Sequence, residues 1–472
     1  MSKGKIVSAA IDGFKQKLTE MCRNCDELFD KVDEKNFSLF TQMLLEASRE
    51  AGKAGLVQYL KENDTIGPTI KKENEILRYK GTSLNELLTL FGTVAFERAM
   101  YYDENNGGQY YFPLDEALGL QKDDFATLET REMILFASAL GVPSEVEQLL
   151  KKCSLCQPSR TAIQNIINRD GSVMEGMRQQ LAEKVYNEKK VPATTEALVA
   201  SLDGVNVLLR EPGLKKGRRP VRPTDDQSYG LSSTSYHNAM VGSVSLYAAD
   251  SDGKPERLCS IYTARMPEEK STEFKLDFER MVKISMDKVD GKIPRVLLTD
   301  GHLMIKGFAA QCELFKPFEK LLDFFHATEH LSKAADALFG EKTDFSKAYF
   351  TKWRDRLKTD HSAPVSIMRS LEGYSKRIRL SKARRAELKT EIVFFRKNRK
   401  LMRYAEFRKR GLPIGSGPIE AAAKSIIRQR MCRSGMSWSR EKGQYVVTVR
   451  AFVKSGLWDV AWGQYKELRK AA

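Results

Sequence analysis

The chain has 472 residues, of which 42% are hydrophobic and 30% charged, a composition that can bury cores and that excludes disorder as the default. A single core is also excluded at this length, and we expect roughly two to four packed units. Lysine plus arginine outnumber aspartate plus glutamate by 78 to 62, a formal charge of +16 that favours a polyanionic partner such as nucleic acid. The alternative is a basic surface that serves solubility alone.

The beginning of the chain lacks the apolar stretch of a signal peptide, and no apolar run approaches the roughly 20 residues that span a bilayer. We therefore expect a cytoplasmic protein without a membrane partner. The sequence contains two C-x-x-C pairs, Cys22 with Cys25 and Cys153 with Cys156. Both pairs lie in helical patterns without glycine-containing knuckles, which favours structural cysteines over a zinc ribbon.

The first 190 residues divide into three regions by their hydrophobic patterns. Residues 1–80 are predicted to be a helical N-terminal region, because apolar residues recur there at helical spacing. Residues 81–125 contain two β-prone runs on either side of the segment ENNGG, a pattern typical of a β-hairpin. Residues 126–190 return to helical spacing with breaks near Pro143 and Pro158, and they predict a helix-turn-helix DNA-binding region.

From residue 191 onward the pattern is α/β. Five strand candidates follow one another, with a helical pattern before the last of them, and their sequences are EALVASLDG, VNVLLRE, NAMVGSVSLYAAD, ERLCSIYTARMP and RVLLTDG. Strands, then a helix, then a strand is the order in which an RNase H-like core begins. Residues 191–334 therefore predict the first part of a mixed-sheet core, 335–410 a basic helical insertion, and 411–472 the final core helices. The predicted fold class is α/β.

Three carboxylates are candidates for a metal site. Asp203 and Asp300 each end a strand candidate and precede a glycine. Chemistry gathers at the carboxyl ends of strands, so these two side chains could share divalent ions, although Asp-Gly is also a common turn. Glu420 lies in the first turn of a predicted helix. It either points into the same site or only complements the helix dipole and pairs with Lys424.

A competing metal motif lies between the second and third carboxylates. His326, Glu329 and His330 form H-x-x-E-H, which can place two zinc ligands on one helix face with a glutamate between them. A zinc hydrolase is therefore an alternative function.

Dense basic segments flank the acidic candidates, at 214–222, 375–385 and 395–411. They are typical of phosphate contacts, although each could also be a solvated helix face. The candidate DNA-binding residues are Lys215, Lys216, Arg218 and Arg219 in the first segment, Arg160 and Gln164 in the helix-turn-helix, and Lys424 and Arg428 after Glu420.

Several segments between about 80 and 465 resemble one known family. They are YYFPLDEALGL (110–120), SLDGVNV (201–207), LLTDGH (297–302), DFFHATEHL (323–331) and IGSGPIEAAAKSIIRQRMCRSGMSWS (414–439). These segments are similar to bacterial insertion-sequence transposases of the Kra type, within the RNase H-like DDE superfamily. In one place the sequence departs from these relatives: DENNGGQYY stands where many have a cysteine pair, so we expect no N-terminal zinc knuckle.

The resemblance implies a function and a site. Asp203, Asp300 and Glu420 match the catalytic triad, which would hold Mg²⁺ or Mn²⁺. Asp323 and His326 match an Asp-x-x-His element of the superfamily, and His326 would orient the scissile phosphate or a metal-bound water. The implied activity is DNA cleavage at transposon ends followed by strand transfer.

The implied partners are the terminal inverted repeats and target DNA, both double-stranded, with the protein acting as a homodimer or higher oligomer. A transposase-derived DNA-binding regulator without catalysis is the alternative from a different class.

Overall fold

The computed structural model describes residues 3–23, 32–72, 75–103, 108–153, 156–210, 234–300, 303–377, 379–415 and 417–471. Two compact units divide it, one of Met1–Asp170 with Lys470–Ala472 and the other of Gly171–Arg469. None of the described helices has both the length and the apolar character that crossing a bilayer demands.

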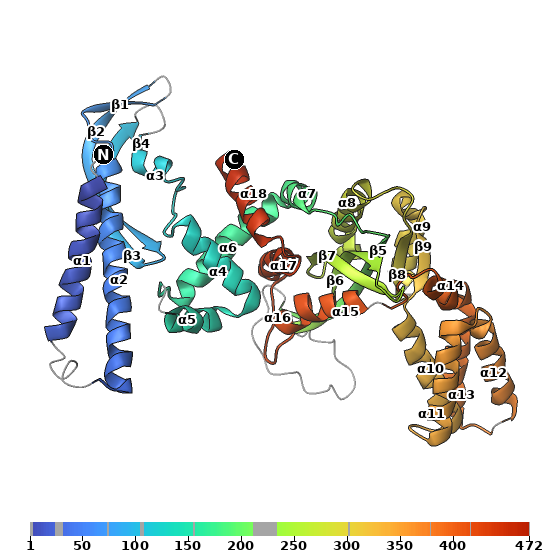
Figure 1. Ribbon diagram of the computed structural model, residues 1–472. Helices are drawn as coiled ribbons and strands as arrows, with labels where there is room; N and C mark the ends of the chain where they lie inside the picture. Colours follow the sequence, from blue (N-terminus) through green and yellow to red (C-terminus); the bar gives the residue numbers. More distant parts are fainter. Residues whose placement is uncertain are drawn as a thin grey trace, which may run out of the picture. The chain divides into compact units, whose positions relative to one another are not determined.

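The first unit begins with a pair of helices and a sheet (Figure 1). Helices α1 (Lys3–Arg23) and α2 (Glu34–Asn63) pack closely, since a Cβ added at Gly13 would lie 2.9 Å from that of Ala54. The antiparallel sheet β1-β2-β3-β4 follows. Its strands are β1 (Thr69–Lys72), β2 (Glu75–Thr89), β3 (Gly92–Asp103) and β4 (Gln109–Tyr111), and α3 (Pro113–Ala117) comes after them.

The long β2–β3 hairpin begins inside the region that the sequence pattern predicts to be helical. Strands β3 and β4 pair on either side of the segment predicted to be a turn. Three helices complete the unit, α4 (Leu128–Leu140), α5 (Pro143–Lys152) and the first part of α6 (Arg160–Gly176). Arg131 on α4 donates a hydrogen bond from Nε to Asp170 on α6 at 2.9 Å, and both side chains are buried. This ion pair fixes α4 against α6.

The second unit contains a five-stranded mixed sheet in the order β7-β6-β5-β8-β9. Strands β5 (Ala197–Arg210), β6 (Thr234–Ala249) and β7 (Pro255–Arg265) pair antiparallel, while β8 (Arg295–Thr299) and β9 (Glu319–Leu322) add in parallel. The two predicted strands around residues 196–211 are one continuous strand, β5, and the short β9 was not predicted.

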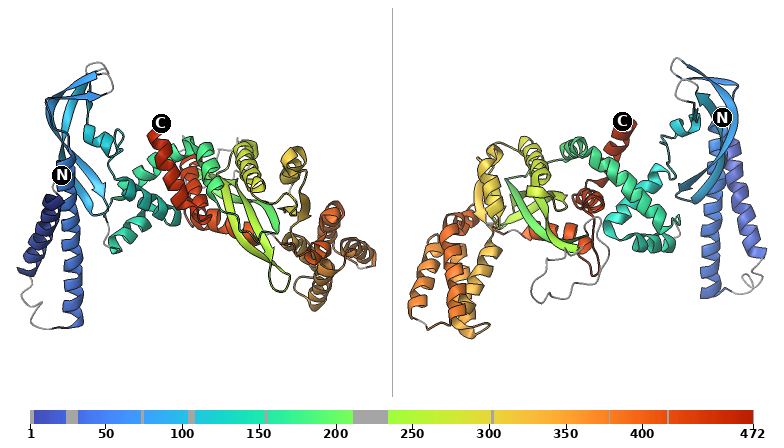
Figure 2. Two further views of the ribbon diagram at one scale, coloured as in Figure 1. Left: turned by 45° about the horizontal axis from the view of Figure 1, so that its top comes forward. Right: turned by 180° about the vertical axis from the view of Figure 1, so that it is seen from behind.

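Helices surround this sheet and extend from it (Figures 1 and 2). They are α7 (Arg178–Glu188), α8 (Thr272–Asp287), α9 (Leu303–Gln311), α10 (Phe324–Phe339), α11 (Asp344–Thr359), α12 (Ala363–Arg377), α13 (Lys382–Asn398), α14 (Tyr404–Lys409), α15 (Gly417–Ala422), α16 (Gln429–Met431), α17 (Arg440–Lys454) and α18 (Trp458–Ala471). A π-helical turn, η5 (Ala423–Arg428), joins α15 to α16. Short 3-10 turns lie at η2 (Glu269–Ser271), η3 (Glu313–Phe315) and η4 (Arg399–Leu401).

One hydrophobic core runs from the sheet into the bundle of α10 to α13. Val199 on β5 and Leu298 on β8 belong to the same buried cluster as Leu331 on α10 and Phe395 on α13. Each large apolar side chain that is fully buried contributes about 1.5–3 kcal/mol. The bundle, which covers the predicted insertion, is therefore packed as a continuation of the sheet's core.

Candidate functional site

Strands β5 and β8 bring Asp203 and Asp300 to the same level of the sheet. The two strands are parallel, and Ser201 pairs with Leu298. Two residues further along each strand, Asp203 and Asp300 therefore lie side by side where β8 ends. Asp203 is not at the end of its strand as predicted, because β5 continues to Arg210 alongside β6. The backbone N–H of Gly204 donates to Asp203 Oδ1 at 2.7 Å.

Glu420 lies in the first turn of α15, as the sequence predicts. The residue is exposed, whereas its neighbours Ile419 and Ala422 are buried. Helix α15 packs against β5 and β6. Its apolar side therefore contacts the sheet, and Glu420 remains at the solvent boundary near the carboxyl end of β8.

The electrostatics of Asp203 relate it to the other two carboxylates. Burial raises the pKa of Asp203, and the negative charges of Asp300 and Glu420 raise that pKa further. The hydrogen bond from Gly204 and the positive charge of Arg428 lower the same pKa and offset part of the rise. Like charges act in this way only at short range, so Asp300 and Glu420 both lie within electrostatic range of Asp203 although they are far apart in sequence.

The chemistry of this acidic site fits a divalent cation. Three carboxylates offer the hard oxygen ligands that Mg²⁺ and Mn²⁺ prefer. The mutual repulsion that raises the pKa of Asp203 is what a bound cation would relieve. Over the part of the chain that the structure describes, no three His, Cys, Asp or Glu side chains are close enough to hold one ion. The exposed Glu420 side chain would therefore have to turn towards the two aspartates to complete a metal site.

His326 stands beside Asp300 at the start of α10. Asp323 is the N-cap of this helix and accepts a hydrogen bond from the backbone N–H of His326 at 2.7 Å. Burial lowers the pKa of His326, and His330 lowers it further, while Asp300 and Glu329 raise it. The net direction is downward, so the imidazole next to Asp300 is neutral at physiological pH and can accept or donate one hydrogen bond.

His330 lies one turn after His326 on α10, with the two ring centroids 4.8 Å apart, and it contacts α13. Its Nδ1 lies 2.6 Å from Glu391 Oε2 on α13, and its ring stacks on Phe394 at a centroid distance of 3.5 Å. Glu329, the remaining member of H-x-x-E-H, lies 3.9 Å from His326 Nδ1. The His330 side chain packs α10 against α13 through these contacts. A zinc site at H-x-x-E-H would need the same side chain as a ligand, so the geometry does not favour the zinc-hydrolase alternative.

The candidate DNA-binding residues fall into three groups. Lys215, Lys216, Arg218 and Arg219 lie outside the described residues. Lys424 and Arg428 are exposed on η5, and Arg428 is close enough to lower the pKa of Asp203.

In the first unit, the two candidates on α6 already make intramolecular contacts. Arg160 Nε lies 2.5 Å from Glu147 Oε2, and Gln164 Nε2 donates to Asn168 at 3.0 Å. Contact with DNA would have to compete with both interactions.

Some of the basic residues in the predicted insertion are paired with carboxylates. Arg410 and Arg403 both form ion pairs with Glu319 on β9, and Arg396 forms one with Glu372. These arginines join elements of the protein, so not all of the basic segment at 395–411 is available for phosphates.

Three of the four paired cysteines lie among the described residues. Cys156 is buried, and burial raises its pKa to about 11, whereas Cys153 is exposed. Cys22 is half-buried, and Cys25 lies outside the described residues. The buried, protonated Cys156 is a structural residue, as the sequence predicts for these pairs.

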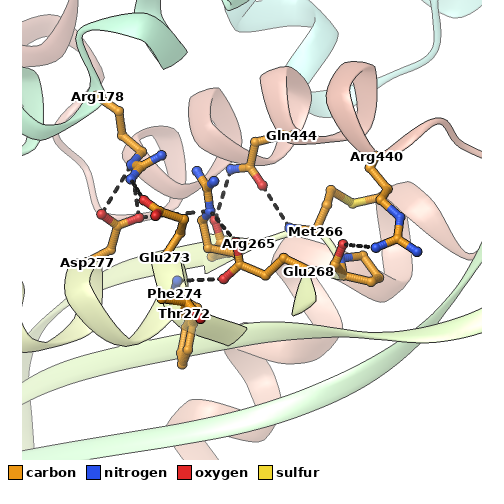
Figure 3. A network of polar contacts seen from close by, with 12 residues as sticks. Arg178, Arg265, Met266, Glu268, Thr272, Glu273, Phe274, Asp277, Arg440 and Gln444 are labelled. Carbon is orange, nitrogen blue, oxygen red and sulfur yellow. Dashed lines mark hydrogen bonds and ion pairs between the residues drawn. The ribbon is translucent and has the colours of Figure 1, made fainter. Parts of the chain in front are cut away.

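A polar network that the sequence analysis did not find joins α7, α8, β7 and α17 (Figure 3). Arg178 donates to Asp277 at 3.1 Å and to Glu273 at 2.7 Å. Gln444 accepts from the backbone N–H of Met266 at 2.8 Å. The network stabilises the β7 side of the sheet, away from the carboxylates at β5 and β8. Its members lie far apart in the sequence, from Arg178 to Gln444, so no local pattern signals them.

Comparisons with known proteins add little to this geometry. No protein-family model matches the sequence, and no curated protein matches it. Among solved structures, the chain is similar to the "Drosophila P element transposase strand transfer complex", with a TM-score of 0.25 and 11% identity. That match covers 75% of this chain and 84% of the other. A TM-score this low carries no argument about fold or activity.

Proposed function

We propose that the chain is a DNA transposase that uses Asp203, Asp300 and Glu420 in a metal-dependent reaction of the DDE type. The observation that carries the proposal is that neighbouring parallel strands bring Asp203 and Asp300 side by side, with Glu420 on α15 within electrostatic range of Asp203. The sequence motifs around the same three residues resemble those of insertion-sequence transposases.

The arrangement of the second unit supports an RNase H-like core. Three antiparallel strands, β5 to β7, are followed by α8 and then by the parallel strands β8 and β9. Strands followed by a helix and a further strand were expected from the sequence, whereas the unbroken β5 and the additional strand β9 were not. The arrangement places the first two carboxylates on adjacent central strands, and the third is on a helix that packs against the same sheet.

The residues of the site have distinct roles in the proposed reaction. Asp203, Asp300 and Glu420 would hold two Mg²⁺ or Mn²⁺ ions, which when bound supply an activated water or 3′-hydroxyl and stabilise the leaving oxygen. The neutral His326 would orient the scissile phosphate by hydrogen bonding. In the first step, hydrolysis, water adds to phosphorus and the 3′-oxygen leaves as a hydroxyl. In the second step, transesterification, that 3′-hydroxyl attacks the phosphorus of a second phosphodiester, whose own 3′-oxygen is displaced and leaves as a hydroxyl.

DNA is the proposed substrate and partner. Lys424 and Arg428 are exposed on the turn that follows Glu420, where they can neutralise phosphates next to the carboxylates. The candidates Arg160 and Gln164 on α6 would contact base edges in the terminal repeats, and Lys215, Lys216, Arg218 and Arg219 would contact the DNA backbone. Assembly as a homodimer or higher oligomer on DNA belongs to the same proposal.

A cleavage assay tests this function. DNA that carries the sequences flanking the gene should be nicked only when Mg²⁺ or Mn²⁺ is added. Asp203→Asn and Glu420→Gln should each lower the rate by several orders of magnitude and leave DNA binding nearly intact, because each removes a metal ligand and not a DNA contact.

The matched control is Glu273→Gln, which changes a carboxylate of the polar network on α8. It should cleave at close to the wild-type rate. Cleavage by Asp203→Asn or Glu420→Gln at the wild-type rate would show that the triad is wrongly assigned at that position. Binding without any cleavage in the wild-type protein would favour a DNA-binding regulator.

A further inference from the structure

The helix that carries Glu420 changes its winding directly after this residue. Helix α15 ends at Ala422, η5 continues as a π-helical turn from Ala423 to Arg428, and α16 follows. Buried residues recur along one side of all three segments, namely Ile419, Ala422, Ala423, Ile426, Ile427, Arg430 and Met431. The π turn is therefore part of a continuous helix that packs against β5 and β6.

π-helical turns are uncommon, and they are often found at functional sites. A π turn is wider than an α turn and fits poorly into the regular backbone hydrogen bonding of a helix. In η5 a side chain from another element supplies hydrogen bonds. Arg450 on α17 donates from Nε to the carbonyl oxygen of Ser425 at 2.7 Å, and one of its terminal nitrogens donates to the same oxygen. The Ser425 hydroxyl in turn donates to the carbonyl of Ala422 at 3.3 Å.

Burying the Arg450 guanidinium at this position costs free energy of folding. Arg450 is only 3% exposed, and burial lowers its pKa to about 10. A buried charged group destabilises a fold unless its hydrogen bonds repay the lost hydration. Two donors of the Arg450 guanidinium bind one backbone carbonyl in the middle of η5. These hydrogen bonds connect the guanidinium directly to the π turn.

The turn held by Arg450 lies between two groups that act on Asp203. Glu420 comes three residues before η5 begins, and Arg428 is its last residue. Glu420 raises and Arg428 lowers the pKa of Asp203, so both groups lie within electrostatic range of it. The winding of η5 determines how far apart these two groups are along the helix.

We propose that Arg450 is a positioning residue for the carboxylate site: by bonding the Ser425 carbonyl it maintains the π turn that places Glu420 and Arg428 relative to Asp203. This inference rests on the proposed function. In it, Arg450 acts through the helix backbone and is not a catalytic residue.

Mn²⁺ binding to the full-length protein, followed by electron paramagnetic resonance, tests the proposal. Arg450→Met removes both donors and should weaken Mn²⁺ binding by about tenfold, the lower end of the effect typical of groups that orient metal ligands. Arg450→Lys keeps the charge but replaces two converging donors with one ammonium group, so its Kd should lie between those of wild type and Arg450→Met. Hydrogen exchange in the peptide 417–431 should accelerate in the same order.

Two controls separate positioning from general destabilisation and from failure of the proposed function. Arg178→Met breaks the ion pairs with Asp277 and Glu273 in the same unit, and it should leave the Kd for Mn²⁺ within about twofold of wild type, because additivity holds for distant sites. Asp203→Asn defines the metal site. If Asp203→Asn does not weaken Mn²⁺ binding in an otherwise wild-type chain, the proposed function itself fails.

Where Asp203 does bind Mn²⁺, an unchanged Kd in both Arg450 variants overturns the inference, even if hydrogen exchange accelerates. Equal weakening in Arg178→Met overturns it too, because the loss would then reflect stability alone. If Arg450→Met does not fold, the decision falls to Arg450→Lys: a Kd above wild type supports positioning, and a wild-type Kd contradicts it.

Discussion

At Asp203, burial and two neighbouring negative charges act in the same direction on one carboxyl group. A buried ionised carboxylate without a partner is destabilising, and more so beside two others. A bound divalent cation would offset both the cost of burying the charge and the repulsion between the carboxylates. The environment of Asp203 therefore fits the proposed role of this residue in metal-dependent phosphoryl transfer.

His330 distinguishes the two metal sites that the sequence allows. His330→Ala removes the contact with the buried Glu391 and the stacking on Phe394, and it should destabilise the fold by about 1–3 kcal/mol. Mg²⁺-dependent cleavage should persist in this variant, since His330 contacts Glu391 and Phe394 on α13 and has no proposed role in the reaction. Urea unfolding and the cleavage assay measure the two effects.

The control is His326→Ala, which should lose activity because His326 lies beside Asp300. If the wild-type protein binds one equivalent of zinc and loses it together with activity in His330→Ala, the H-x-x-E-H motif is the true metal site.

The sequence proposes candidates for the site residues, but it does not predict the backbone around Asp203. Asp-Gly is a frequent turn dipeptide, so the pattern ended the strand there. In the structure Gly204 lies within β5, and a Cβ added to it would lie 2.4 Å from the Asn238 side chain on β6. Glycine is needed for this close approach between strands, a reason that only the paired strand reveals.

Among the elements, the short strand β9 links the sheet to the segment around α14. Glu319 on β9 accepts hydrogen bonds from Arg410 at 2.6 Å and Arg403 at 3.2 Å. The hydrogen bond from Arg410 is the main cause that lowers the pKa of Glu319, with burial acting against it.

This pair predicts a dependence of stability on pH. An unfolded glutamate has a pKa of about 4.3, and the folded value is lower. The pair therefore stabilises the fold fully above the unfolded pKa, and its contribution is lost as the pH falls through the folded pKa. Glu319→Gln should cost about 1 kcal/mol at pH 7, because the group is partly exposed, and the difference from wild type should shrink below pH of about 4.

Urea unfolding at pH 7 and at acidic pH measures this difference. Glu313→Gln is the control, since Glu313 is 79% exposed beside Lys316 and should be close to neutral at both values. A cost for Glu319→Gln that stays constant down to strongly acidic pH would contradict the ion-pair account.

The elements that could not be predicted share a physical cause. Strand β9 is four residues long with the sequence EKLL, too short for an alternating pattern, and it exists because β8 pairs with it. The π turn η5 keeps apolar residues at spacings that an α-helix also gives, so the sequence predicts an ordinary helix there. In both cases the tertiary partner decides the local structure.

At the scale of the whole molecule, the second unit explains how a helical bundle and a sheet can serve one site. The core that includes Val199 on β5 and Leu298 on β8 continues into α10. The same strands position Asp203 and Asp300, and α10 positions His326. A composition rich in both apolar and basic residues predicts a multidomain, polyanion-binding protein, but it does not show which segments share a core.

Iron-mediated cleavage of the polypeptide tests the central claim most directly. Fe²⁺ replaces Mg²⁺ at carboxylate sites and, with ascorbate and peroxide, generates hydroxyl radicals that cut the backbone next to the ion. The proposed site predicts cuts clustered near residues 203, 300 and 420, suppressed by excess Mg²⁺ and absent in Asp203→Asn. Cuts elsewhere in the chain, with none near 203 and 420, would contradict the assignment of the three carboxylates to one metal site.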